Sequence, residues 1–321
     1  MVKSLLKQGA TPIVMDMKEN NMIFEQIMSA EEMGSFTRIF GNIADAELIE
    51  KIVLEHKPTS IIHLAGLQIP TCRGNPKLGA TVNVIGTINV FEAAVKLKEA
   101  TGTAPQVVYA SSAAILGPKE DYATTPVPDD QYHKPKTLYG VFKLCNEGTA
   151  RIYAQDHGIN SVGLRPYTCF GVGREVGLTS APTKAIKAAV LGRKFEIGFS
   201  GFTGFSYIED IARIFIGCSR APAAGAHFFN IRGDVDTVEN FVKIMSEVLP
   251  AAKDLITVTG NEITIMYDVD ESGLQAFLDT LPEHQAIAKP FPLPMADCIK
   301  ETAESFVALQ KAGKLTDRDL V

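Results

Sequence analysis

The chain has 321 residues, of which 46% are hydrophobic and 21% charged, proportions of a globular protein with a sizeable core. Its net charge of −6, without a dense run of basic residues, argues against a nucleic-acid or anionic-membrane surface, and we find no apolar run long enough to span a bilayer. Its five cysteines form no CxxC pair and its six histidines no metal-ligand spacing, so we expect a reduced, cytoplasmic protein without a metal site.

The first third of the chain predicts strands alternating with helices. Residues 1–10 predict a helix that Gly9 closes, and residues 13–16 a strand. The stretch 17–35 is polar and shows no clear period. We predict a strand over 36–42 and then a helix over 45–56, capped by Asp45.

The central part continues the alternation. Strands are predicted at 60–65, 107–110 and 161–165, and helices at 79–99 and 137–158. The loop 117–135 is long and rich in Pro and Asp, so we expect a partial lid. Beyond residue 171 we predict amphipathic helices at 179–192 and 238–249 and a strand at 263–269. Alternating strands and helices indicate an α/β protein with a parallel sheet covered on both faces.

Tyr139 and Lys143 carry the strongest chemical signal. Residues four apart share a helix face, where an ammonium near a phenol lowers the pKa of that phenol from about 10 and makes it a general acid/base. A packed tyrosine followed by a surface lysine has the same spacing. Two upstream strands add weight: one ends in Leu64-Ala65-Gly66 and the other in Ser111-Ser112, followed by Gly117.

The order strand-LAG, strand-SSxxxxG and YxxxK resembles the extended short-chain dehydrogenase/reductase family. The resemblance is strongest to the NAD-dependent epimerase/dehydratase branch, which includes UDP-glucose 4-epimerases, and it runs over almost the whole chain. It implies a doubly wound, Rossmann-type parallel sheet with a smaller mixed α/β C-terminal lobe. We expect residues 1–168 to form the NAD-binding domain, with 201–232 returning to it. Residues 169–200 and 233–321 would form the substrate-binding lobe.

Members of this family open with a strand and a glycine-rich turn of the TGxxGxxG kind, which approaches the dinucleotide pyrophosphate. This chain begins with what corresponds to the back half of the first helix. We therefore expect the strand and turn to be missing, with a gap at the centre of the sheet. A truncated start and a divergent protein are the two explanations. The glycines of residues 171–177 follow a late strand with a different spacing and are not that turn.

The resemblance assigns cofactor contacts along the chain. Asp16 ends a strand where a carboxylate accepts hydrogen bonds from the adenosine ribose and repels a 2′-phosphate, which favours NAD over NADP, although Lys18 lies nearby. The other expected contacts are Asn42 and Ile43 at the adenine, Leu64, Ala65 and Gly66 beneath the cofactor, Asn83 beside it, Lys143 and Tyr139 at the nicotinamide ribose, and the main chain of Pro166 and Tyr167 at the carboxamide.

By resemblance, Ser112, Tyr139 and Lys143 are the catalytic residues. Ser112 would bind the substrate oxygen, and Tyr139 would exchange a proton with it as hydride moves to or from the nicotinamide. Lys143 would bind the ribose and keep Tyr139 acidic. Ser111 is expected to be structural. Epimerases and dehydratases return the hydride, so their NAD is not consumed.

The substrate residues depart from the family pattern. Thr168 stands where nucleotide-sugar enzymes usually have an asparagine, and no arginine precedes Tyr207 to clamp a diphosphate. A free sugar, a sugar acid or another polyol-like compound fits as well. Gln68, Ser112, Thr168, Ser180 and Thr183 are the candidate substrate contacts. Arg174, Lys184 and Lys187 have the charge to hold an anion, although basic residues on helix faces are usually solvated.

We therefore expect an oxidoreductase or isomerase of carbohydrate metabolism, an NAD-dependent epimerase/dehydratase-type enzyme acting on a sugar-like substrate. The alternatives are an NAD-dependent dehydrogenase of a non-nucleotide polyol or sugar acid, which would accumulate NADH, and a non-catalytic binding or regulatory protein. The family precedent also implies a homodimer formed through the helices that carry Asn89 and Tyr139.

Overall fold

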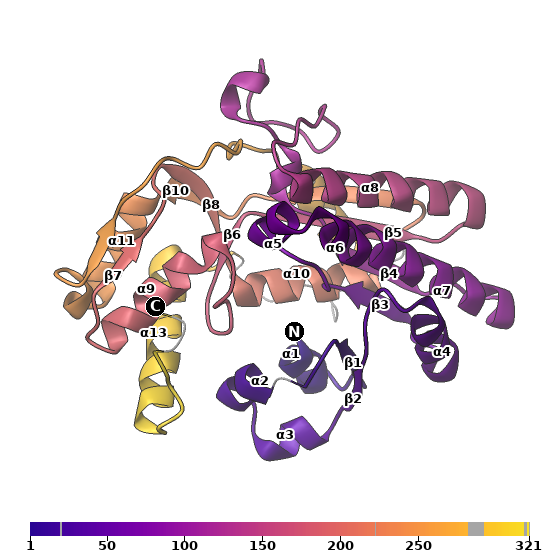
Figure 1. The fold of residues 1–321 in the computed structure, drawn as a ribbon, viewed down its shortest axis with the longest axis horizontal. Coiled ribbons are helices and arrows are strands. Elements are labelled where there is room, and N and C mark those ends of the chain that lie inside the picture. Colours follow the sequence, from indigo (N-terminus) through magenta and orange to yellow (C-terminus); the bar gives the residue numbers. More distant parts are fainter. Residues whose placement is uncertain (20, 222, 282–291, 318–319, 321) are drawn as a thin grey trace.

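Four parallel strands in the order β3-β4-β5-β9 form the main sheet (Figure 1). The computed structural model describes residues 1–321 except 20, 222, 282–291, 318–319 and 321. The strands are β3 Ser60–His63, β4 Gln106–Ala110, β5 Ser161–Pro166 and β9 Ala226–Ile231. This arrangement confirms the predicted α/β class with a parallel sheet.

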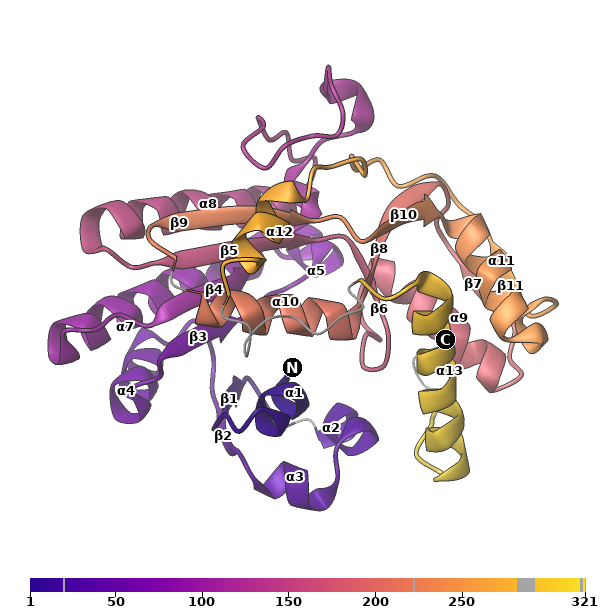
Figure 2. The ribbon, with the colours of Figure 1, turned by 180° about the vertical axis from the view of Figure 1, so that it is seen from behind.

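Both faces of the main sheet are buried, as the apolar composition of its strands requires. Along β4, Val107 and Tyr109 pack on one face with α4, α7 and α8, whereas Val108 packs on the other with α10 and α12. The two helical layers are visible from opposite sides in Figures 1 and 2. These helices are α4 Ala46–His56, α7 Gly86–Thr101, α8 Leu138–His157, α10 Ile208–Arg220 and α12 Ser272–Leu278.

A separate two-stranded sheet lies beyond β3. It consists of β1 (Ile13–Asp16) and β2 (Thr37–Phe40), paired in parallel, and both figures show it apart from the main sheet. Among the described residues no strand joins β1 to β3. The expected gap in the doubly wound sheet is therefore present, because the strand that would pair with both edges is not among the described residues.

Three short helices surround the small sheet: α1 Val2–Lys7, α2 Asn21–Ile27 and α3 Ala30–Gly34. The sequence interpretation of 17–35 as an irregular polar stretch missed α2 and α3. Ser29 and Glu32 form a capping box at the start of α3, since the side chain of each accepts a hydrogen bond from the main-chain N–H of the other. The Ser-x-x-Glu spacing was the available signal.

The C-terminal lobe is built on two smaller sheets. One has the order β10-β8-β6, with mixed directions, and the other pairs β7 with β11. The rings of Phe170, Phe205 and Phe241 form its core, with a centroid distance of 4.7 Å between the last two. The domain limits given above stay a prediction. The elements of this lobe are β6 Thr168–Phe170, α9 Ala181–Val190, β7 Phe195–Ile197, β8 Phe202–Tyr207, β10 Asp234–Thr237, α11 Val238–Val248, β11 Ile256–Val258 and α13 Met295–Lys311.

The predicted strand over 263–269 is wrong. Apart from one isolated bridge, between Val127 and Val269, this segment is irregular. The main chain of Val127 also bonds to Asp268 and Asp270, at 2.9 and 2.8 Å, so the segment fastens the long loop 117–135. The lid function of that loop stays a prediction. The apolar pattern reflects burial of Met266 and Val269 beneath the loop rather than pairing in a sheet.

One continuous helical run over residues 76–101 comprises α6 Pro76–Ala80, the π-helical turn η1 Thr81–Ile85 and α7. By length and composition alone it qualifies as a membrane span, contrary to the sequence expectation. Its most apolar window is 56% buried inside the protein, and a core helix passes the same criterion.

Candidate active site

Helix α8 places Tyr139 and Lys143 on one face, one turn apart. It begins after Thr137, whose hydroxyl accepts the main-chain N–H of Gly140 at 3.0 Å. Lys143 is buried, and its Nζ lies 5.7 Å from the centroid of the Tyr139 ring. Nζ donates instead to the carbonyl oxygen of Ala110, at 2.6 Å. The lysine therefore links the first turns of α8 to the end of β4.

Ser112 lies just past the end of β4 and opposite Tyr139. It caps the short 3-10 helix η2 (Ala113–Ile115), where its Oγ accepts the N–H of Ala114 at 3.1 Å. Its side chain also lies close enough to the Tyr139 hydroxyl to oppose the rise of the Tyr139 pKa. The structure thus brings together the three residues predicted to be catalytic.

The protonation states differ from the sequence expectation. Burial raises the pKa of Tyr139, while Ser112 and the charge of Arg174 oppose that rise. Burial also lowers the pKa of Lys143 to about 8. The predicted lowering of the Tyr139 pKa by Lys143 is therefore wrong for the unliganded protein, because the ammonium is directed to Ala110 and because burial outweighs the favourable charges.

Asn83 fixes the loop that follows β3. Its amide exchanges two hydrogen bonds with the main chain of Leu67, at 2.8 and 2.9 Å, and its own carbonyl accepts from Asn146 at 2.9 Å. Asn83 lies in the π-helical turn η1, a type of distortion that frequently marks functional sites. A Cβ on Gly66 would lie 2.9 Å from Asn83 Oδ1 and 3.5 Å from Lys143 Nζ. Gly66 therefore lies against both Asn83 and Lys143, two of the other residues expected to support a cofactor.

The residues expected at the adenosine end lie by the small sheet. Asp16 is exposed at the end of β1, and its carboxylate accepts the N–H of Met17 at 2.6 Å. Asn42 is also exposed, and its Oδ1 accepts the N–H of Ala44 at 3.0 Å. The carbonyl of Ile43 accepts from Asn89 Nδ2 at 2.9 Å, which ties this loop to α7.

These residues fit the two ends of a dinucleotide. Leu64, Ala65 and Gly66 are exposed beside Lys143 at the end of β3, and Asp16 presents a carboxylate at the end of β1. Pro166 ends β5 at the same edge of the sheet. In the space between β1 and β3, the described residues form no glycine-rich turn from a strand into a helix. The described part of the chain therefore does not supply the usual contact to the pyrophosphate.

Most of the predicted substrate hydroxyls bond within the protein. Thr168 and Thr203 share a hydrogen bond of 2.8 Å, Ser180 Oγ donates to Gly177 O at 2.7 Å, and Thr183 Oγ1 accepts from Gly171 N at 3.1 Å. All of these hydroxyl groups belong to buried residues. Their contact with substrate stays a prediction.

Two other predicted contacts connect the sheet to the C-terminal lobe. Gln68 is half-buried, and its Nε2 donates to the carbonyl of Val176 at 3.4 Å. The hydroxyl of Tyr167, which follows β5, donates to Met266 O at 2.5 Å. The amide of Gln68 and the phenol of Tyr167 therefore hold the lobe segments 171–180 and 263–269 against the sheet.

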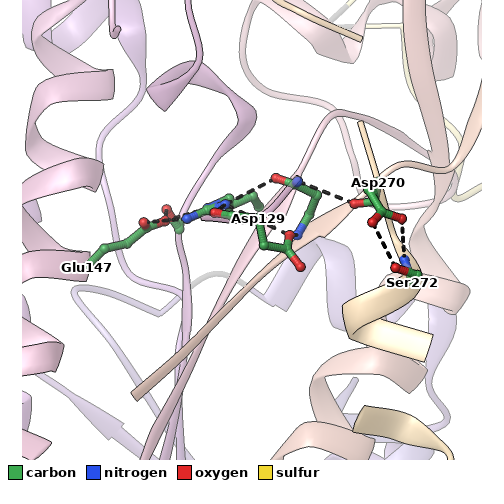
Figure 3. Close-up of polar contacts among 7 residues, drawn as sticks. Asp129, Glu147, Asp270 and Ser272 are labelled. Atoms are coloured by element: carbon green, nitrogen blue, oxygen red, sulfur yellow. Dashed lines mark hydrogen bonds and ion pairs between the residues drawn. The ribbon is translucent and has the colours of Figure 1, made fainter. Parts of the chain in front are cut away.

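The sequence analysis missed a buried polar network that joins α8, the helix of Tyr139 and Lys143, to β5. Arg165 of β5 makes two bonds of 2.8 Å to the carboxylate of Glu147 on α8, and Ser111 Oγ donates to that carboxylate at 2.6 Å. Arg165 also reaches Asp129 O at 2.8 Å. Figure 3 shows this chain of contacts running on toward Asp270 and Ser272. The role of Ser111 here is structural, as expected.

Comparison with known proteins decides the family. Residues 1–231 match the NAD dependent epimerase/dehydratase family. The chain belongs to this family. UDP-glucose 4-epimerase of Mycolicibacterium smegmatis is 26% identical over 218 residues, which are 66% of this chain and 66% of that protein. The mitochondrial L-threonine 3-dehydrogenase of Bos taurus is 24% identical over 289 residues, 87% of this chain and 69% of that protein.

Solved structures share the fold. UDP-glucose 4-epimerase of Thermotoga maritima, in complex with UDP-glucose, superposes with a TM-score of 0.78 at 18% identity. The match covers 96% of this chain and 94% of that protein. A monomeric L-threonine 3-dehydrogenase from a metagenome has a TM-score of 0.77 at 20% identity with the same coverage. Relatives therefore include both enzymes that act on UDP-sugars and enzymes named for an amino acid.

Proposed function

We propose that this family member is an NAD-dependent oxidoreductase of the epimerase/dehydratase type that acts on a sugar or sugar derivative. The observation that carries the proposal is the convergence of Ser112, Tyr139 and Lys143 beside the exposed Gly66 loop. A tyrosine and a lysine with no role in catalysis would not be expected to lie at the end of β4 next to a serine that acts on the pKa of the phenol. The residue types and their order are those of an acid/base site for hydride transfer.

The residues divide the chemistry of an alcohol oxidation. Ser112 donates or accepts a hydrogen bond at the reacting oxygen of the substrate, and the deprotonated Tyr139 hydroxyl removes the proton from it. Burial disfavours the phenolate, and the charge of Arg174 opposes that effect. Bound NAD would supply the hydride acceptor. In the reverse direction, Tyr139 returns the proton to a carbonyl oxygen.

NAD is proposed over NADP because Asp16 stands at the end of β1 with its side chain exposed. A carboxylate there accepts hydrogen bonds from two ribose hydroxyls and repels a 2′-phosphate. Lys18 lies in the same exposed turn and would reduce that preference without reversing it.

A dehydrogenase that releases NADH is the second candidate. Two observations favour it: the threonine dehydrogenase relative matches 87% of the chain, and Thr203, Gly204 and Phe205 occupy the stretch where a diphosphate-binding arginine is expected. An epimerase returns the hydride to its substrate, whereas a dehydrogenase accumulates one NADH for each substrate molecule that it oxidises.

A homodimer through α7 and α8 is proposed from the family precedent, and exposed apolar residues on α8 and on the helical run that precedes α7 support it. Five large hydrophobic side chains on the α6–α8 helices remain between 43% and 51% exposed: Leu78, Ile85, Leu138, Val141 and Ile152. Exposed large apolar side chains are typical of an interface when they lie side by side on neighbouring helices. Substitution Val141→Glu is expected to lower the oligomeric mass measured by light scattering.

The experiment that tests the function combines cofactor binding and turnover. The chain has no tryptophan, so NADH binding can be followed by the fluorescence of the cofactor itself. The purified protein is then incubated with saturating NAD and a panel of UDP-sugars, sugar acids, polyols and L-threonine. Formation of NADH or of an epimer supports the proposal. NADH binding without turnover of any compound would favour a non-catalytic binding protein.

A further inference from the structure

The segment between β6 and α9 is a built loop that presents Arg174. Gly171 and Gly177 adopt φ values of 128° and 102°, which favour glycine and give the segment its sharp turns. The N–H of Gly171 donates to Thr183 Oγ1 and the N–H of Arg174 to Gly171 O, both at 3.1 Å. Ser180 Oγ closes the other end on Gly177 O. The main chain on both sides of Arg174 is therefore fixed.

The neighbouring residue anchors this loop from beneath. Glu175 forms an ion pair of 3.4 Å with Lys187 of α9, and these side chains are only 9% and 1% exposed. Lys187 is thus not the solvated helix residue that its sequence pattern predicted. Burying two charges is unfavourable unless they are paired in a defined geometry. The pair therefore holds residue 175 toward the lobe, next to Arg174.

The guanidinium of Arg174 is held by hydrogen bonds within its loop but keeps further N–H donors. Nη1 donates to Val176 O, and Nη2 donates to Thr179 Oγ1 at 3.3 Å. These bonds use two of its five N–H donors. Val176 O also accepts from Gln68, which places the arginine loop against the loop that carries Gly66. In the part of the chain that the structure describes, no acidic group pairs with this cation.

Arg174 also acts on the proposed acid/base. Its charge opposes the rise of the Tyr139 pKa that burial causes, and it likewise opposes the rise at Cys169 of β6. The guanidinium therefore lies close enough to Tyr139 for its charge to act on the phenol, on a loop that Gln68 holds against the segment following Gly66. A half-buried cation with spare donors beside a proton-transfer site is suited to a substrate anion.

We propose that Arg174 binds an anionic group of the substrate, a carboxylate or a phosphate, beside the oxygen that Tyr139 deprotonates. This inference rests on the proposed function and narrows its substrate class. Sugar acids, hydroxy acids or sugar phosphates are favoured over neutral sugars and polyols. The planar fork of arginine binds both oxygens of a carboxylate, which would also orient the reacting carbon.

The test compares a neutral sugar with its carboxylate, phosphate and nucleotide derivatives and with an amino acid. Binding of D-glucose, D-glucuronate, D-glucose 6-phosphate, UDP-glucose and L-threonine is measured by saturation-transfer NMR in the presence of NADH. Substitution Arg174→Gln is expected to weaken binding of the recognised anion by about tenfold or more and to leave D-glucose unchanged. Arg174→Lys keeps the positive charge but loses the two-pronged guanidinium, so its affinity for the anion should lie between those of the wild type and Arg174→Gln. The carboxylate and phosphate probes distinguish the two sources of the anion.

Two controls separate this role from a structural one. Arg193→Gln removes an exposed arginine that pairs with Asp317 at 3.2 Å and should change no probe. Titration of tyrosinate absorbance, as the difference from Tyr139→Phe, should show a higher Tyr139 pKa in Arg174→Gln, and unchanged circular dichroism shows that this variant folds.

The outcomes for the anion site and for the enzyme are independent. If the wild type binds none of the charged probes, or if Arg174→Gln binds them as well as the wild type does, the anion site is overturned. If Arg174→Gln loses binding of UDP-glucose and of no other probe, the anion that Arg174 binds is a nucleotide diphosphate. If no probe yields NADH or an epimer while Arg174-dependent binding persists, the proposed reaction fails and the anion site stands.

Discussion

Lys143 donates a hydrogen bond of 2.6 Å from Nζ to the carbonyl oxygen of Ala110, the last residue of β4. The bond crosses from α8 to the end of the central sheet, beside Gly66 and 5.7 Å from the ring of Tyr139. An ammonium buried this deeply is tolerated because one strong acceptor faces it. Burial removes the ammonium from water, and this desolvation lowers its pKa to about 8.

This burial predicts a pH-dependent stability. The folded-state pKa of Lys143 is about 8 against 10.5 for the free side chain, so the unfolded chain binds more protons between these values. The penalty of about 3 kcal/mol is fully present below pH 8 and disappears as the pH rises toward 10.5. Lys143→Met should therefore raise the free energy of unfolding at pH 7, with a gain that shrinks at pH 10. Urea unfolding at both values measures this.

Lys51→Met is the matched control, since Lys51 is exposed on α4. Its effect on the free energy of unfolding should be small at both pH values. A gain for Lys143→Met that does not change between pH 7 and 10 would contradict the lowered pKa and would point to packing alone.

Removing the phenolic hydroxyl should stop the chemistry and spare the cofactor. Tyr139→Phe is expected to lower kcat by about two to four orders of magnitude, the usual contribution of general acid/base catalysis. NADH affinity should stay within a few-fold, because the ring and Lys143 remain. Tyr132→Phe is the control, since Tyr132 is 75% exposed in the long loop. A Tyr139→Phe enzyme as fast as wild type would exclude the proposed mechanism.

The sequence predicted those features that depend on local patterns. The four-residue spacing of Tyr139 and Lys143 puts both on α8, and apolar runs mark the strands of the main sheet. Segment 263–269 has a strand-like composition but packs beneath a loop, because tertiary burial decides whether such a segment pairs. The direction of the Tyr139 pKa was also beyond the sequence, since it depends on burial and on the acceptor chosen by Lys143.

The ion pair of Arg165 and Glu147 should be costly to break. Both side chains are at most 2% exposed and make two hydrogen bonds of 2.8 Å. Arg165→Met alone is expected to lower the free energy of unfolding by about 3–5 kcal/mol, because it leaves the buried Glu147 carboxylate without a cation. Glu147→Gln should cost less, because Arg165 keeps a longer ion pair of 3.9 Å with Asp129. The double variant should lose less than the sum of the two. A double-mutant cycle in urea measures the coupling.

The exposed pair of Lys96 and Glu99 on α7 provides the comparison, with the same kind of contact at 3.0 Å. Glu99→Gln should cost less than about 1 kcal/mol. Equal costs for the buried and exposed pairs would mean that Arg165 finds a substitute acceptor. The sequence contained one trace of the network, since Tyr139, Lys143 and Glu147 repeat every four residues along one helix face. Their partners come from distant strands and loops, which no local pattern reveals.

Gly66 tests whether the loop after β3 supports the cofactor. A Cβ at this position would lie 2.9 Å from Asn83 Oδ1, and Asn83 cannot move easily because it is buried and holds the main chain of Leu67. Gly66→Ala should therefore displace the loop and weaken NADH binding by about tenfold, measured by the fluorescence of the cofactor. Gly74→Ala is the control, since no atom lies within 4 Å of its Cβ position. If Gly66→Ala binds NADH as the wild type does, the cofactor does not lie against this loop and the proposed position of the nicotinamide beside Lys143 is wrong.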